Sequence, residues 1–199
     1  MASQYTDVDR MILKRWEEVH ALREAFDDLV DRMQDIVEGV LQKVSTTMAE
    51  KGLSAEFYLK RPSIWFWKRD WASKKNEPGV YVEIFDFVPS EYGKDVEEYP
   101  SVWVMTTEFS RLKIRENSED FGQAVRAALS PELLPKWSHA DADLAESPLG
   151  RDCSDVSESD RVRLVTDPGA LGKFILARVD EAMELVPAID LALQKMTRR

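Results

Sequence analysis

The sequence contains few of the residues that support metal binding or nucleophilic catalysis. Its 199 residues include two His and one Cys. A single cysteine, Cys153, cannot form a disulfide within the chain, which favours a reducing compartment. The nearby Asp152, Asp155 and Glu158 are expected to raise the pKa of its thiol and to make the thiolate scarce. We therefore predict no catalytic residue, no metal site and no cofactor, and favour a protein that is not an enzyme.

Long apolar runs and an excess of positive charge are also absent. No stretch approaches the ~20 consecutive apolar residues that a membrane-spanning helix needs, and residues 1–16 lack the basic start and apolar run of a secretory signal. The chain has 27 Lys and Arg against 37 Asp and Glu, a net charge of −10, which opposes general attraction to nucleic acid or anionic lipid. These absences predict a cytoplasmic protein that binds no membrane, with a protein partner favoured over nucleic acid.

Length and composition are those of one folded domain. Apolar residues make up 44% of the chain, and a globule of this size buries roughly 70% of its unfolded surface without help from metals or disulfides. We predict an α+β fold, in which an antiparallel meander of three to four strands packs against long N- and C-terminal helices that form a coiled-coil-like pair. The parts of this single domain, 1–199, are a long helical arm (1–52), the β-meander (53–115), a short helix, acidic loop and strand (116–166), and a C-terminal helix (167–199).

Residues 7–51 are predicted to form one long helix. Thr6 and Asp9 have the spacing of a capping box, and Gly52 suits the position after a helix end. Apolar residues recur at alternating spacings of three and four, which is the a/d pattern of a coiled coil. They are Val19, Leu22, Phe26, Leu29, Met33, Ile36 and Val40. A helix of ~45 residues would be roughly 65–70 Å long, so part of it is expected to project, bend or pair.

The C-terminal segment carries a second apolar seam. Asp167 followed by Pro168 is a favoured helix start, and Pro187 is expected to interrupt the helix near 184–186. The spacing again alternates between three and four, at Ile175, Val179, Ala182, Val186, Ile189, Leu193 and Met196. The two terminal helices are expected to pack together, either within one chain or across a homodimer.

The middle of the chain is predicted to form strands separated by clusters of turn-forming residues. Short connections between consecutive strands favour an antiparallel meander. The predicted strands are Ser63–Arg69, Gly79–Val88, Ser101–Phe109 and, later in the chain, Arg161–Thr166. Ser118–Leu129 is predicted to be a short helix, and His139–Asp160 a polar, acidic loop.

Segment 60–75 combines tryptophan with positive charge, because it holds six basic residues and one acid. On a strand, Trp65, Trp67 and Arg69 would share one face. Such side chains suit a protein groove or peptide, and they also suit stacking on bases. Alternatively, the rings cover the long helix while the Lys and Arg stems reach water. The predicted binding residues are Trp65, Trp67, Lys68, Arg69 and Trp71.

Clustered carboxylates on the predicted sheet raise a second function class, a metal-dependent nuclease. Glu83 and Asp86 lie on one strand, Glu108 on the next, and Lys113 follows. However, Glu83 and Asp86 are three apart, so a regular strand places them on opposite faces. The Glu-x-Lys spacing of such nucleases is also absent after Glu108.

Two further patterns are weaker. His139, Asp141 and Asp143 alternate, so an extended backbone would place one imidazole and two carboxylates on one side, as a transition metal needs. Residues 169–173 resemble part of a phosphate-binding loop, but Phe174 stands where the loop requires Ser or Thr. Chance spacing and an ordinary helix start explain these patterns more simply.

These features together favour a non-enzymatic cytosolic protein-interaction, adaptor or regulatory protein. It would act through helical self-association of its acidic arm and through the Trp-rich, basic surface. The alternative is a nucleic-acid-binding or metal-dependent nuclease-like protein that uses segment 60–75 and the sheet carboxylates.

Overall fold

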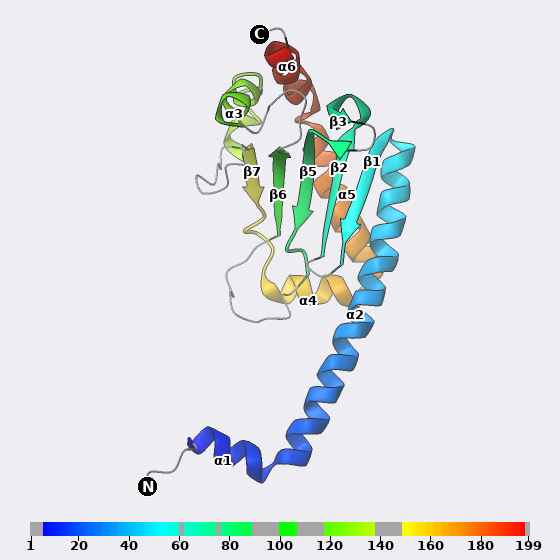
Figure 1. Ribbon diagram of the computed structural model, residues 1–199, viewed down its shortest axis with the longest axis vertical. Coiled ribbons are helices and arrows are strands. Elements are labelled where there is room, and N and C mark those ends of the chain that lie inside the picture. The colour runs from blue at the N-terminus through cyan, green and yellow to red at the C-terminus, as the bar shows by residue number, and fades with distance from the viewer. Residues whose placement is uncertain are drawn as a thin grey trace.

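A five-stranded antiparallel sheet and six α-helices make up the part of the chain that the computed structural model describes (Figure 1). The described residues are 6–59, 62–74, 77–88, 100–106, 118–137 and 149–197. The predicted α+β class is confirmed, and a long N-terminal helix is present. The helices are α1 (Asp7–Lys14), α2 (Trp16–Glu50), α3 (Ser118–Arg126), α4 (Glu158–Thr166), α5 (Pro168–Met183) and α6 (Val186–Thr197).

The main sheet has five strands rather than the predicted three to four. Its order is β1-β2-β5-β6-β7, and each neighbouring pair is antiparallel, so the strands follow one another as in a meander. A small hairpin of β3 (Ala72–Lys74) and β4 (Glu77–Pro78) is inserted after the short 3₁₀ helix η1 (Arg69–Trp71). The five strands are β1 (Leu53–Tyr58), β2 (Ser63–Lys68), β5 (Val80–Phe85), β6 (Ser101–Thr106) and β7 (Leu149–Asp152).

The prediction of a strand at Arg161–Thr166 is wrong, because these residues belong to helix α4. Ser157 caps this helix by accepting a hydrogen bond from the backbone N–H of Asp160, whose side chain accepts one from the Ser157 backbone N–H. This capping box satisfies donors at the helix start and favours helix over strand. The late strand is instead β7, which pairs with β6 and places Trp103 opposite Gly150.

The predicted helix 7–51 is present but divided at Arg15. The Thr6–Asp9 capping box is formed at its start, and Gly52 follows its end with a φ of +77°, a conformation that glycine adopts at little cost. At Arg15 the backbone leaves the helical region, with φ −119° and ψ 33°, so α1 and α2 are separate helices. Figure 1 shows α1 turned away from the axis of α2.

Helices α5 and α6 contribute their seam to the core. Ile175, Val179, Ala182 and Ile189 are fully buried, and α5 lies behind the sheet in Figure 1. The predicted interruption before Pro187 is confirmed, because α5 ends at Met183 and α6 begins at Val186.

Only the C-terminal half of α2 joins this core. Val40 lies at its contact with α5, since a Cβ added at Gly172 would be 3.7 Å from Val40 Cγ1. Lys51 at the end of α2 forms an ion pair with Asp180 of α5. The N-terminal half of α2 extends beyond the sheet together with α1 (Figure 1). The buried residues of α2 are Val37, Val40, Leu41, Val44 and Met48.

Candidate functional site

The projecting N-terminal helices carry an unusual apolar surface. We call residues 7–32 the arm. Between residues 8 and 29, large apolar side chains keep 36–71% of their surface exposed. Exposed apolar side chains concentrated in one segment commonly mark an interaction site. The residues concerned are Val8, Met11, Leu13, Trp16, Val19, Leu22, Phe26 and Leu29.

Four of these residues form one stripe along α2, and we call Val19, Leu22, Phe26 and Leu29 the exposed seam. They occupy the a and d positions of the heptad pattern, so they lie on one side of the helix. The same pattern continues through half-buried Met33 and Ile36 to Val40, which is 3% exposed. One continuous seam therefore passes from solvent into the core of the protein.

The charged side chains on this part of α2 are solvated. Residues 16–32 contain two arginines and six acids. Arg23 Nε lies 3.9 Å from Asp27 Oδ2, and Arg15 Nη1 lies 3.8 Å from Glu18 Oε2. Exposed pairs of this length contribute little to stability. They therefore place little constraint on the charged side chains of the arm.

The Trp-rich, basic segment is placed mostly inside the fold. Trp67 and Trp71 are 4% and 2% exposed, Trp65 and Lys68 are half-buried, and Arg69 is exposed. Trp65 and Trp67 lie two residues apart on β2, but β2 ends at Lys68 and Arg69 opens η1. The prediction that Arg69 continues the same strand is therefore wrong. Only part of the predicted set is therefore accessible to solvent.

Asp190 of α6 holds two members of this segment. Its Oδ1 accepts a hydrogen bond from Trp71 Nε1 at 2.7 Å, and its Oδ2 pairs with Lys68 Nζ at 2.6 Å. Half-buried charge-assisted hydrogen bonds of this kind fix the geometry of the groups they join. The contact ties the end of β2 and the η1 turn to the last helix. Sequence spacing offered no signal for a pairing across more than 100 residues.

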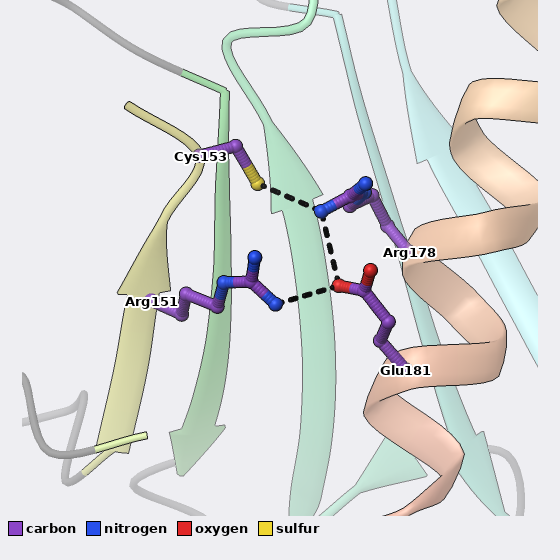
Figure 2. Close-up of polar contacts among 4 residues, drawn as sticks. All are labelled: Arg151, Cys153, Arg178 and Glu181. Atoms are coloured by element: carbon purple, nitrogen blue, oxygen red, sulfur yellow. Dashed lines mark hydrogen bonds and ion pairs between the residues drawn. The ribbon is translucent and has the colours of Figure 1, made fainter. Parts of the chain in front are cut away.

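Cys153 lies in a cluster that joins the end of β7 to α5 (Figure 2). Arg178 Nη1 is 3.6 Å from Cys153 Sγ and 3.0 Å from Glu181 Oε2, which also accepts from Arg151 Nη1 at 2.9 Å. Burial raises the pKa of the Cys153 thiol, and the two guanidinium groups offset this in part. The raised pKa was predicted, but its main cause is desolvation rather than neighbouring carboxylates. A buried, protonated thiol is a poor nucleophile.

The carboxylates considered for a nuclease are only partly within the described residues. Glu83 lies on β5 opposite Trp65 and Trp103, and Asp86 follows that strand with a φ of +56°. Glu108 and Lys113 lie outside the described residues. The same holds for the predicted His139, Asp141 and Asp143 set. Among the described residues, no group of three or more His, Cys, Asp or Glu side chains is placed to hold a metal ion.

The glycine-containing start of α5 is already occupied by a side chain of the protein. Asp167 Oδ1 accepts hydrogen bonds from the backbone N–H groups of Gly169 and Ala170, at 3.0 and 3.1 Å. These are the donors that a bound phosphate would use at a helix N-terminus. The segment therefore acts as a capped helix start, as the sequence suggested.

Arg161 is a buried charged residue that the sequence did not single out. It is 4% exposed, and within the described part of the chain its Nε has no hydrogen-bond partner. It lies on α4 one turn before buried Val165. A strand was predicted here, whereas the structure has a helix on which Arg161 is buried.

Comparisons with known proteins return no relative. No protein-family model, curated protein or solved structure matches this chain. In the ranges that the structure describes, no helix has both the length and the apolar character needed to cross a membrane. The chemistry and exposure of the described residues are therefore the basis for a functional assignment.

Proposed function

We propose that this protein is a non-enzymatic interaction protein, of adaptor or regulatory type, that binds a partner helix along its arm. The observation that carries the proposal is the exposed seam. Val19, Leu22, Phe26 and Leu29 have coiled-coil spacing and remain 36–71% exposed, while the same seam is buried further along α2. A helix partner fits because a/d residues pack into the spaces between the side chains of a facing helix.

The free energy available to such a partner is substantial. Full burial of a Leu or Phe side chain stabilises by about 1.5–3 kcal/mol. With roughly half of each seam residue still exposed, docking would stabilise by on the order of 3–6 kcal/mol before the cost of association. Trp16, which is 59% exposed next to the seam, would add to this. An amphipathic helix without a partner leaves its apolar stripe in water and does not obtain this stabilisation.

The segment around β2 supplies a second, smaller surface in this proposal. Arg69 is exposed and Trp65 half-buried, so these two residues would contact a partner directly. Trp67, Trp71 and Lys68 would support them from within, through packing and through Asp190. Arg beside Trp is a combination that protein-binding sites favour.

The nucleic-acid alternative has less support from the described residues. Lys68 is already paired with Asp190, and the chain as a whole carries a charge of −10. Phosphate binding requires several free cations on one face. We therefore place this alternative second, to be tested by the salt dependence of any binding to DNA or RNA.

Affinity capture with matched variants tests the proposed function. The wild-type chain, the seam variant Leu22→Glu/Phe26→Glu and the outward-facing control Glu24→Gln would each be used as bait in nuclease-treated cell extract. We expect specific proteins, including the chain itself where it is present, to be retained by wild type and control and lost with the seam variant. Retention that is the same for all three baits would contradict a role for the arm in binding.

A further inference from the structure

The occupant of the exposed seam follows from the length, the charge pattern and the surroundings of the arm. Resting on the proposed function, we propose that the arm binds a second copy of this chain. The two arms would pair antiparallel, related by a twofold axis near Glu24. This identifies the partner and orientation, which the proposed function leaves open.

The apolar layers of such a pair are complete. In an antiparallel coiled coil an a residue of one helix lies in the same layer as a d residue of the other. Val19 then meets Leu29 of the second copy, and Leu22 meets Phe26, with both contacts repeated by symmetry. All four layers are apolar, and no seam residue lacks a partner.

The straight part of the arm has matching limits at its two ends. It begins after the break at Arg15 and ends at Met33, where α2 becomes half-buried in its own domain. The same antiparallel register places Arg15 of one copy opposite Met33 of the other. Each arm would therefore bend away where it reaches the partner's domain. The ~17 residues between these limits span about 25 Å.

The flanking charges suit a second copy better than a basic partner. Five of the six acids in residues 16–32 fall at b, c or f positions, away from the seam. Glu18 is the one acid at a flanking g position, and Arg32 occupies another. Antiparallel pairing places Glu18 against Arg32 of the second copy, twice by symmetry. Arg32 forms no ion pair with any residue that the structure describes, so it is available for this contact.

A parallel pair of arms is disfavoured by the contacts that α2 makes with its own domain after Met33. From Val37 onward the seam side of α2 is buried, and at Val40 it contacts α5. A parallel partner helix would run toward this occupied side and would bring its own domain with it. Antiparallel pairing does bring Arg23 close to Arg23 of the second copy. Each has Asp27 one turn away, 3.9 Å from its Nε, which reduces the repulsion.

The first test is the mass of the full chain in solution, measured by sedimentation at several concentrations. We expect a monomer–dimer equilibrium, at least a tenfold weaker dimer for Leu22→Glu/Phe26→Glu, and no change for Glu24→Gln. Circular dichroism would show whether the seam variant keeps its fold, which is expected because the core uses residues 37–48 of α2. A monomer at every concentration would overturn the inference. If seam-dependent capture of a different protein persisted, the proposed function would still stand.

Engineered cysteines test the orientation, in a Cys153→Ala background that removes the native thiol. Antiparallel pairing predicts that Arg23→Cys forms a disulfide-linked dimer under mild oxidation, whereas Val19→Cys, displaced from its own symmetry mate by about 15 Å, does not. A parallel pair gives the reverse result and would overturn the antiparallel arrangement. Charge reversal is a second check: Glu18→Arg is expected to weaken the dimer a few-fold, and the double variant Glu18→Arg/Arg32→Glu to restore it.

Discussion

At the scale of single residues, burial governs the chemistry of this chain more than sequence neighbours do. Cys153 has three acids close in the sequence, yet the groups that contact it are Arg178 and, through Glu181, Arg151. The rise in its thiol pKa comes first from desolvation. Arg161 shows the same effect, because the helix rather than the local sequence buries it. Neither environment can be predicted from the neighbouring residues in the sequence.

Cys153 is expected to be unreactive in the folded protein and to make stability fall at high pH. A thiol whose folded pKa is raised holds its proton more tightly than the unfolded chain, so stability is lost as pH rises above the ordinary thiol value. Relative to Cys153→Ala, the wild-type unfolding free energy should thus decrease from about pH 9 upward. Modification by a thiol reagent at neutral pH should require unfolding. Rapid modification of the native chain would contradict this.

Arg161→Met is expected to increase the stability of the protein. It removes a guanidinium that is 4% exposed and whose Nε has no partner in the described residues, and a buried unsatisfied polar group costs about 1–3 kcal/mol. Thermal denaturation measures the change, with Arg163→Met, an exposed arginine on the same helix, as the control. A loss of stability specific to Arg161→Met would contradict this prediction.

At the scale of elements, glycine marks where strands pack closely and where a helix is merely weakened. Gly150 on β7 faces the Trp103 ring, and a Cβ built there would lie 2.4 Å from Trp103 Cδ2. Gly39 lies within α2 with nothing within 4 Å of its Cβ position. The first glycine is required by a tertiary contact, whereas the second only reduces helix propensity.

Substitution of these two glycines by alanine is expected to have opposite effects. Gly150→Ala should lower the unfolding free energy by about 2–3 kcal/mol, because the indole or the strand must move. Gly39→Ala should raise it by about 0.5–1 kcal/mol through better helix propensity. Denaturant unfolding of both variants in parallel measures the difference. Equal effects would show that β7 does not pack on Trp103 as described.

At the scale of the whole molecule, α2 belongs to two environments. Its C-terminal half is in the core, and its N-terminal half extends into solvent with apolar residues on the same seam (Figure 1). Leu41 is fully buried and Leu22 is 71% exposed, although both lie on one helix. Fold stability and the proposed binding therefore depend on different parts of α2.

Matched leucine substitutions on α2 test this separation. Leu41→Ala is expected to cost about 2–5 kcal/mol of stability at any protein concentration, as for a buried leucine. Leu22→Ala should change stability by less than about 0.5 kcal/mol at high dilution. Its cost should grow as the concentration rises, if assembly stabilises the chain. Thermal unfolding over a hundredfold range of concentration makes the comparison. A large concentration-independent cost for Leu22→Ala would place that residue in the core.

Several features were predictable because they depend on residues within one or two turns of the chain. The Thr6–Asp9 capping box, the Asp167-Pro168 helix start and the interruption before Pro187 are of this kind. The two helix starts and the interruption depend only on local hydrogen bonds and backbone preferences, which the sequence carries directly. β2, β5 and β6 coincide with predicted runs of β-branched and aromatic residues, whereas β7 lies far along the chain from its partner β6.

Tertiary structure decided what is buried and what is left exposed. Helix α4 begins at a local capping box, but its buried face is set by packing on α5 and α2. The tryptophans of segment 60–75 have the composition of a binding surface. However, Asp190, more than 100 residues away, accepts hydrogen bonds from Trp71 and Lys68 and holds this segment against α6. The apolar seam of α2 has the same spacing before and after Met33, yet only the part after Met33 is buried in the core. Burial is set by contacts between distant segments, and a local pattern specifies a face without specifying what lies against it.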